Sequence, residues 1–233
     1  MAHSGRISST PNCRWPAAAC YPGNGLRGGN AVSDQRPVAV VLGGGLARRM
    51  GGGDKALVRL RGRPLLDHVL DRIRPQVRAV ALSANGDPAR FIAWGIAVLA
   101  DPVPGNPGPL AGILAGMRWA RRMHPATRFL VSVPTDTPLL PDDLVARLLA
   151  ARGPGESGVA CAASRGQRHP VVALWPVALA DALAEALAAG AQGVGAFAEA
   201  QGLAVAEFPA AGLDPFLNVN DRHDLAGAAR LVT

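Results

Sequence analysis

The 233-residue chain is poor in cysteine, in aromatic side chains and in long apolar runs. No apolar stretch approaches the roughly 20 residues that a transmembrane helix needs, so we expect no membrane association. The three cysteines, Cys13, Cys20 and Cys161, form neither a disulfide framework nor a metal-ligand pattern, which predicts a reducing, cytoplasmic location. Aromatic residues make up 4% of the chain, too few to provide stacking platforms among the basic residues.

Lysine is nearly absent as well, because Lys55 is the single lysine among 24 basic residues. An ammonium group is a compact point charge with three donors, which suits a phosphate oxygen in a tight pocket better than a planar guanidinium does. An ordinary surface lysine is the alternative. The net charge of +7 comes from scattered arginines rather than from a continuous basic stripe, so it favours anionic small molecules over nucleic acid.

The length and the 49% hydrophobic content predict one globular domain, which we expect to be a monomer. Residues 1–36 lack periodicity and the apolar core of a secretion signal. We therefore interpret them as a disordered tail, or as a stretch preceding the true start, and assign residues 37–233 to the domain.

Apolar patterns in the chain alternate between strand-like and helix-like segments. Strands are predicted at 37–42, 79–84, 96–100, 129–134, 158–164, 170–175, 203–208 and 216–220, and helices at 63–77, 109–123, 176–190 and 221–231. A further helix is expected to open at Pro141 with acidic residues in its first turn, and the strands at 158–164 and 170–175 are joined by the basic loop "RGQRHP". Asp221 is the expected N-cap of the closing helix. This alternation predicts an α/β fold with a mostly parallel, mixed sheet between two helical layers.

The stretch "VVLGGGLARRMGGGDKALV" at 40–58 follows the first predicted strand. It is not a P-loop, because Asp54 precedes Lys55 and Ala56 follows it, and Arg48 breaks the dinucleotide-binding pattern. Backbone N–H groups of a glycine loop nevertheless form a concave site for anions. Arg49 and Lys55 add positive charge where a leaving pyrophosphate would form.

Asp136 lies in "TDTP", directly after the predicted strand at 129–134. Loops that follow parallel strands share one edge of the sheet, so we expect Asp136 near the glycine loop. Its carboxylate suits Mg²⁺, which proteins hold with one or two carboxylates plus substrate phosphates. A turn or helix cap before Pro138 is the alternative reading.

"LGGGLARRMGGGDK" resembles the nucleotidyltransferase signature Leu-Ala-Gly-Gly-x-x-x-Arg-Met-Gly-x-x-Lys, with Gly43 in place of alanine. "ADPVPGNPGPLAG", "VPTDTPLLP", "RHPVVALW" and "FLNVN" follow in an order that resembles the molybdenum cofactor guanylyltransferase family. The resemblance covers residues 37 to the end. It implies a Rossmann-like, three-layer nucleotidyltransferase fold of the nucleotide-diphospho-sugar transferase type, and transfer of GMP from GTP to molybdopterin with Mg²⁺. Other cofactor-biosynthesis proteins and acceptor molybdoenzymes are expected as further partners.

The resemblance also implies roles for individual residues. Lys55, Arg49 and Asp136 would be catalytic, with Asp136 as the metal ligand. The nucleotide would lie against Leu42, Gly43, Gly44, Gly45, Lys55, Ser83, Asn85, Asp101 and Asp136, where Ser83 replaces the family's usual asparagine and leaves open whether Ser83 or Asn85 makes the contact. Molybdopterin would be bound by Arg168, His169, Asn218 and Asn220.

Two alternatives stay open at this point. A molybdopterin cytidylyltransferase, or another small-molecule nucleotidyltransferase, would need few changes, because base choice depends on few contacts. A non-catalytic adaptor that binds nucleotide and molybdopterin is the alternative from another class, although an adaptor needs no metal ligand such as Asp136.

Overall fold

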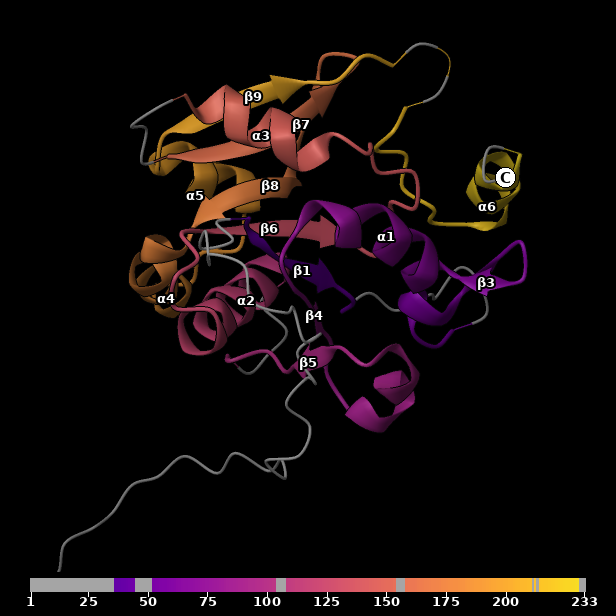
Figure 1. Ribbon diagram of the computed structural model, residues 1–233, viewed down its shortest axis with the longest axis horizontal. Coiled ribbons are helices and arrows are strands. Elements are labelled where there is room, and N and C mark those ends of the chain that lie inside the picture. Colours follow the sequence, from indigo (N-terminus) through magenta and orange to yellow (C-terminus); the bar gives the residue numbers. More distant parts are fainter. Residues whose placement is uncertain are drawn as a thin grey trace, which may run out of the picture. The chain divides into compact units, whose positions relative to one another are not determined.

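The computed structural model describes residues 36–44, 52–103, 108–153, 158–210, 212 and 214–230 (Figure 1). Within these residues the main sheet has seven strands in the order β5-β4-β1-β6-β8-β7-β9. They are β1 Val38–Leu42, β4 Val80–Ser83, β5 Ala97–Leu99, β6 Phe129–Pro134, β7 Val159–Ser164, β8 Gln167–Pro176 and β9 Leu203–Glu207. Strand β8 pairs antiparallel with both of its neighbours, and the other pairs are parallel. The mostly parallel, mixed sheet is therefore confirmed.

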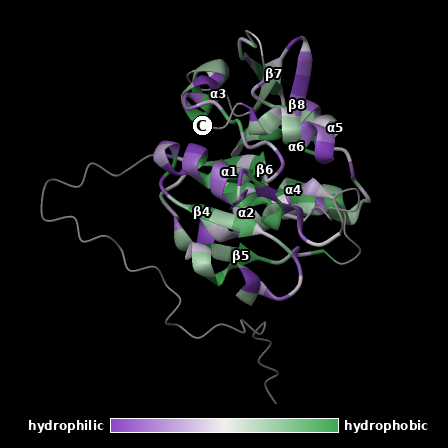
Figure 2. Ribbon diagram, turned by 90° about the vertical axis from the view of Figure 1, so that its right-hand side faces the viewer, coloured by the Kyte–Doolittle hydropathy of each residue, from purple (hydrophilic) through white to green (hydrophobic). Residues whose placement is uncertain are grey.

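Helices cover both faces of this sheet, because its strands bury side chains on both sides. In β1, Ala39 and Val41 belong to the core under α1 (Leu65–Ile73) and α3 (Leu144–Arg152). The alternate residues Val38 and Val40 belong to the core under α2, α4 and α5, whose bounds are Pro109–Met123, Ala180–Ala188 and Val194–Ala200. Figure 2 shows the apolar colour concentrated along the strands between these helical layers. The structure thus has the three layers that the sequence predicted.

A small third cluster fixes the last helix, α6 (Arg222–Ala229). It contains Leu60 of β2 (Arg59–Leu60), Leu65 after β3 (Arg63–Pro64), Val219 and Ala228, all fully buried. Asp221 caps α6 as predicted, because its carboxylate accepts from the backbone N–H groups of His223 and Asp224. The cluster therefore ties the segment before α6 to the start of α1.

Helix α2 lies unusually close to β1 because of two glycines. A Cβ atom on Gly112 would stand 2.6 Å from Leu42 Cδ2, and one on Gly116 would stand 2.9 Å from Val40 Cβ. Both distances are shorter than packed carbon atoms tolerate. The glycines thus set the spacing between α2 and the strand that leads into the glycine-rich loop.

Three local predictions were wrong in detail. Helix α3 begins at Leu144 rather than at Pro141, because Gln76 supplies the cap: its Oε1 accepts from Val145 N at 2.9 Å and its Nε2 donates to Pro141 O at 2.9 Å. The loop "RGQRHP" is shorter than expected, since only Arg165 and Gly166 turn, both with positive φ, and Gln167–Pro176 is strand β8. Residues 216–220 form turn and irregular backbone instead of a strand.

Five short helical segments remain to be described. Helix α5 was not predicted, and the 3-10 helices η3 (Lys55–Leu57), η4 (Arg74–Gln76), η5 (Pro88–Trp94) and η6 (Val177–Leu179) link larger elements. No helix in the described ranges is long and apolar enough to cross a bilayer.

Candidate functional site

The two loops that the sequence singled out leave the same edge of the sheet. Strands β1 and β6 are parallel neighbours, with Leu42 opposite Pro134 at their carboxyl ends. Thr135 strengthens the junction, because its backbone N–H donates to Leu42 O at 3.2 Å and its hydroxyl lies 3.3 Å from the same oxygen. The segment from Gly43 toward Lys55 and the segment "TDTP" therefore start side by side, as predicted.

Lys55 and Asp136 are in direct contact at this edge. Lys55 Nζ lies 2.6 Å from Asp136 Oδ2 and donates a second hydrogen bond of 2.6 Å to Asn220 Oδ1. The two charged side chains are only 12% and 19% exposed, so solvent screens their interaction less than that of a surface pair. The single lysine is thus a constrained charge inside a polar site and not an ordinary surface residue.

Asp136 presents a free oxygen to this site. Its Oδ1 atom is buried and has no hydrogen-bond partner among the described residues, whereas Oδ2 accepts from Lys55. A buried, unpaired carboxylate oxygen is costly unless a cation or a ligand satisfies it. No group of three or more metal-ligating side chains occurs in the described part of the chain. The residues therefore fit a divalent cation held by one carboxylate and completed by substrate oxygens and water.

Asn218 and Asn220 are brought to the site by the residue between them. Val219 is fully buried in the cluster with Leu60 and Leu65, and its N–H donates to Asp136 O at 2.8 Å. The flanking asparagines are exposed on the side of the site. Asn220 accepts from Lys55, and Asn218 Oδ1 accepts from the Thr137 hydroxyl at 2.9 Å. The "NVN" segment is thus held along the "TDT" turn.

Ser83, Asn85 and Asp101 form a second polar group at the ends of β4 and β5. Asn85 Nδ2 donates to Asp101 Oδ2 at 2.7 Å, and Asp101 N donates to Asn85 Oδ1 at 2.9 Å. The Ser83 hydroxyl lies 3.4 Å from Asp101 Oδ1. Gly43 reaches this group, because its N–H donates to Ser83 O at 2.8 Å. Asn85 is therefore the tighter partner of Asp101.

Leu42, Gly43 and Gly44 lie between the two polar groups, at the end of β1. Leu42 is partly buried, Gly43 is buried and Gly44 is exposed. Gly45 and Arg49, which the sequence also assigned to the nucleotide and to catalysis, lie outside the described residues.

Arg168 and His169 lie on β8, and their side chains interact with residues other than Lys55 and Asp136. Arg168 Nη2 lies 2.8 Å from Glu199 Oε1 of α5, and both side chains are about half exposed. His169 Nε2 lies 2.9 Å from Ser164 Oγ, which donates to Asp214 Oδ1 at 2.7 Å, and the His169 ring packs against Phe216. Burial lowers the pKa of His169, and the nearby Asp214 opposes this shift. His169 thus connects the β7–β8 hairpin to the segment that leads to Asn218.

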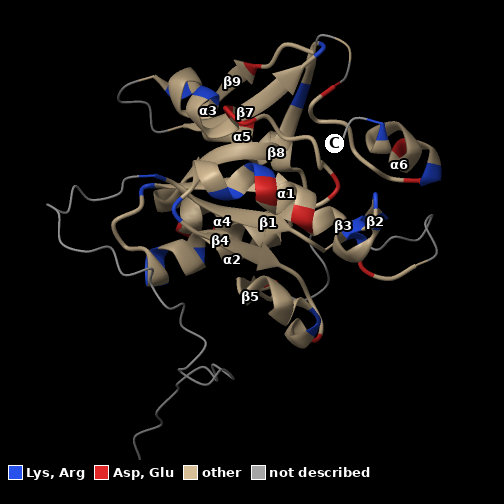
Figure 3. Ribbon diagram, turned by 45° about the vertical axis from the view of Figure 1, so that its right-hand side comes forward, with Lys and Arg blue, Asp and Glu red and all other residues tan. Residues whose placement is uncertain are grey.

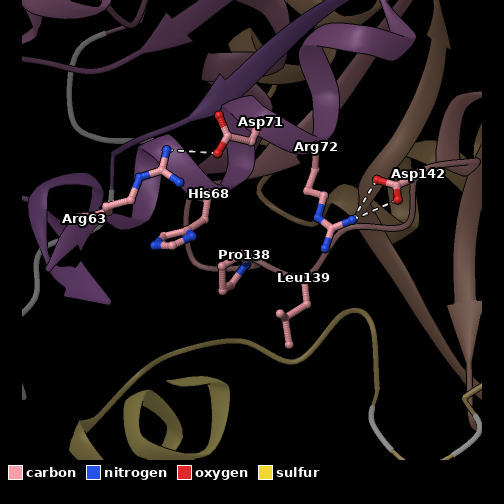
Figure 4. A pocket seen from close by; sticks show the side chains of 7 residues that line it. All are labelled: Arg63, His68, Asp71, Arg72, Pro138, Leu139 and Asp142. Atoms are coloured by element: carbon pink, nitrogen blue, oxygen red, sulfur yellow. Dashed lines mark hydrogen bonds and ion pairs between the residues drawn. The ribbon is translucent and has the colours of Figure 1, made fainter. Parts of the chain in front are cut away.

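A cavity of about 260 Å³ lies beside the site and is lined by Pro138, the last residue of "TDTP", and by Leu139 (Figure 4). Its other lining residues are Arg63, His68, Asp71, Arg72 and Asp142. Figure 4 shows each arginine turned toward a carboxylate: Arg63 lies 2.9 Å from Asp71 and Arg72 lies 2.8 Å from Asp142. The cavity's cations are thus already neutralised, so it offers no ready site for a phosphate.

The surface charge follows the same pattern elsewhere. Basic and acidic residues are interspersed over the ribbon (Figure 3), and Arg121 and Arg147 pair with Asp181 and Asp143. The part of the chain seen in Figure 3 thus shows a mixed charge pattern and not the continuous basic stripe typical of nucleic-acid grooves.

Sequence reasoning missed two residues of the site. Thr137 holds Asn218, and its position inside "TDTP" was the available signal. Arg90 lies 2.5 Å from Asp54, next to Lys55, but it sits on the irregular helix η5 between two strands, where no local pattern marks it.

The fold, and the site at the carboxyl ends of β1 and β6, are those of a nucleotidyltransferase. The MobA-like NTP transferase domain matches residues 39–205, which include both strand-end loops. A structure of molybdopterin-guanine dinucleotide biosynthesis protein A from Archaeoglobus fulgidus has a TM-score of 0.64 and 22% identity, and covers 83% of this chain and 97% of that one. A Mycobacterium tuberculosis protein in complex with manganese has a TM-score of 0.59 and 16% identity, over 84% of this chain and all of that one. At such identities these two structures support the fold.

Sequence similarity identifies the family within the nucleotidyltransferases. A molybdenum cofactor guanylyltransferase of Rhodopseudomonas palustris (strain BisB5) is 50% identical over 194 residues, which are 83% of this chain and 92% of that protein. The chain therefore belongs to the molybdenum cofactor guanylyltransferase family, and the resemblance in its motifs is confirmed.

Proposed function

We propose that the chain transfers GMP from GTP to the terminal phosphate of molybdopterin and releases pyrophosphate. The observation that carries this proposal is the contact between Lys55 and Asp136, which joins the glycine-loop segment to the "TDTP" turn at one edge of the sheet. The name of the relative from Rhodopseudomonas palustris supports the choice of guanine and of the molybdenum cofactor. Substrates of this kind are polyanions, and the site offers them a lysine, backbone N–H groups and a carboxylate suited to a cation.

The reaction follows from the charges of its partners. A phosphate monoester has a second pKa of about 6, so the acceptor phosphate is mostly a dianion near neutral pH and needs no general base. One of its oxygens attacks the α-phosphorus of GTP, the bond from that phosphorus to the β-phosphate oxygen breaks, and pyrophosphate leaves with the electron pair. The obstacle is repulsion between two anions, so this chain contributes mainly position and positive charge.

Lys55 would place its charge on the phosphates. Its Nζ is already held between Asp136 and Asn220, so the amine needs little reorganisation when substrate arrives. Arg49, outside the described residues, would add charge on the leaving pyrophosphate. Asn220, which contacts Lys55, and Asn218, which contacts Thr137, would bind the acceptor phosphate of molybdopterin.

Mg²⁺ is the metal we propose for this site, with Asp136 as its protein ligand through the unpaired Oδ1. When bound, the ion neutralises charge that develops on the phosphates during transfer. The manganese in the Mycobacterium tuberculosis protein, which shares the fold, is consistent with a divalent cation.

The remaining residue roles extend this proposal. Leu42, Gly43, Gly44 and Gly45 would line the nucleotide, while Asp101, held by Asn85 and Ser83, would contact the guanine nucleotide. Arg168 and His169 would serve the molybdopterin side; because His169 Nε2 is engaged by Ser164, we expect its contribution to be indirect. We also propose that the protein is a cytoplasmic monomer and that residues 1–36 are dispensable for catalysis.

Kinetic measurements that compare GTP with CTP test the proposed guanylyl transfer. Purified protein with Mg²⁺ and molybdopterin should release pyrophosphate with GTP and far less with CTP. Equal or faster release with CTP would favour the cytidylyltransferase alternative and overturn the guanylyl assignment.

A further inference from the structure

Arg90 is held in a fixed place by the short helix η5. Asp87 caps this helix by accepting from Ala89 N at 2.9 Å, and Phe91 is fully buried in the core. At the other end of η5, Trp94 Nε1 donates to Asp67 Oδ1 of α1 at 2.6 Å. The backbone of Arg90 is therefore anchored on both sides, so its side chain starts from a rigid base.

The guanidinium of Arg90 joins two segments that are distant in sequence. Its Nε lies 2.5 Å from Asp54 Oδ2, and its Nη2 donates to Asn85 O. Its Cζ lies 4.9 Å from the centre of the Phe91 ring, which supports the planar group from below. The Arg90 and Asp54 side chains are only 29% and 20% exposed, so this is a partly buried pair.

Each of these two segments carries part of the proposed site. Asp54 stands at the N-cap position of η3, yet its carboxylate caps no helix N–H and interacts with Arg90 instead. The next residue, Lys55, contacts Asp136. On the other side, Asn85 is bonded twice to Asp101. Arg90 thus connects Asp54, the neighbour of the lysine proposed to bind phosphate, to the Asn85–Asp101 pair, which is expected to contact the guanine nucleotide.

We infer that Arg90 is a positioning residue, which fixes the Lys55 segment relative to the Asn85–Asp101 pair without touching substrate itself. The nucleotide role of these residues rests on the proposed function. Geometry is one half of the effect, because a nucleoside triphosphate must meet both groups at once. Charge is the other half: Arg90 neutralises the Asp54 carboxylate, which would otherwise repel phosphates from a position adjacent to Lys55.

The single lysine of the chain allows a test without any nucleotide. An amine-reactive acylating reagent can modify only Lys55 and the N-terminal amine, and mass spectrometry separates the two products. Releasing the Asp54 segment should expose Lys55 through local opening. We expect Arg90→Gln to react about fivefold faster at Lys55 than the parent chain, with an unchanged rate at the N-terminus.

Arg121→Gln is the matched control, because Arg121 pairs with Asp181 at 2.8 Å on α2 and α4, away from the site. Its Lys55 reactivity should equal that of the parent chain. A rate for Arg90→Gln within twofold of the control would overturn the inference. Because this experiment uses no GTP, it stands even if the parent chain fails to use GTP, a result that would overturn the proposed function alone.

Kinetics then show whether Arg90 acts through Asp54. Arg90→Gln should raise the KM for GTP about tenfold and change kcat much less, and Arg90→Lys should restore part of the loss by keeping a charge beside Asp54. In an Asp54→Asn background, Arg90→Gln should have little further effect, because the repulsive charge is gone. If the effects of Arg90→Gln and Asp54→Asn on the KM for GTP added fully in the double variant, Arg90 would not act through Asp54. An unchanged KM in Arg90→Gln would contradict the positioning role as well.

Discussion

At the scale of single residues, the site depends on two charged side chains, Lys55 and Asp136, which have few hydrogen-bond partners in the described part of the chain. Lys55 binds Asp136 and Asn220, and one oxygen of Asp136 has no hydrogen-bond partner among the described residues. Because Arg and Lys differ in shape, and Asp and Asn in charge, conservative replacements separate geometry from electrostatics.

Lys55→Ala should reduce kcat/KM for GTP by about ten- to a hundredfold, since a charge-assisted contact is worth roughly 1.5–3 kcal/mol. Lys55→Arg should recover only part of this, because a planar guanidinium cannot occupy a space in which Asp136 and Asn220 both lie 2.6 Å from Nζ. Steady-state kinetics of the three proteins measure the effect. Full activity of Lys55→Arg would mean that the charge alone matters.

Asp136→Asn should lower kcat more than it weakens GTP binding, and should raise the Mg²⁺ concentration needed for half-maximal rate. In the proposed mechanism the metal would neutralise charge that grows in the transition state, whereas the N–H groups of the glycine loop would already hold the ground-state phosphates. Kinetics over a series of Mg²⁺ concentrations test this, with Asp142→Asn as control, because Asp142 pairs with Arg72 beside the cavity. Normal turnover with normal Mg²⁺ dependence would reduce Asp136 to a turn residue.

Much of the site could be predicted at this scale. The sequence predicted that the glycine-loop segment and Asp136 lie at one edge of the sheet, because each follows a buried strand, but it did not predict the direct contact between Lys55 and Asp136. Arg90 could not be predicted, since its partner Asp54 is 36 residues away and the contact exists only after η5 docks on α1. Likewise, that Asn85 rather than Ser83 binds Asp101 tightly depends on side-chain distances that no pattern encodes.

At the scale of elements, strong apolar periodicity and the placement of glycines determined which predicted helices and strands match the structure. The predicted helix 109–123 and strand 129–134 coincide with α2 and β6. Helix α3 starts late because Gln76, on a separate element, caps it, and residues 216–220 are not a strand because Val219 packs into the cluster with α6. Tertiary contacts overrode local preference at both places.

Two helical glycines give opposite expectations for one substitution. Gly116→Val should destabilise the fold by about 1–3 kcal/mol, because the new side chain collides with Val40 and Leu130. Gly227→Val in α6 should be nearly neutral, since no described residue lies within 4 Å of the added Cβ. Urea unfolding measures both free energies. Equal effects at the two positions would contradict the close packing of α2 on β1.

At the scale of the whole molecule, stability should fall as the pH drops below about 6.5. Burial lowers the pKa of both His124 and His169 in the folded chain, and the positive charge of Arg78 lowers that of His124 further. The unfolded chain therefore binds protons at these residues first, and stability is lost from their unfolded pKa of about 6.5 down to their folded pKa. Below the folded pKa, these residues add no further loss.

The double variant His124→Gln/His169→Gln isolates this effect. The slope of the unfolding free energy against pH, measured by urea titration between about pH 6.5 and 5, should be smaller than in the parent chain. An unchanged slope would assign the pH dependence to other groups.

As an enzyme, the whole molecule should join GMP to molybdopterin, and a single incubation measures this transfer. The full chain is incubated with Mg²⁺ and molybdopterin and with each of the four nucleoside triphosphates, and the pterin product is weighed by mass spectrometry alongside pyrophosphate release. We predict a product heavier by one GMP unit, formed with GTP and accompanied by one pyrophosphate for each product. A product that carries CMP, formed at an equal or higher rate, would show that the chain is not a guanylyltransferase, and binding of GTP without pyrophosphate release would show that it transfers no nucleotide.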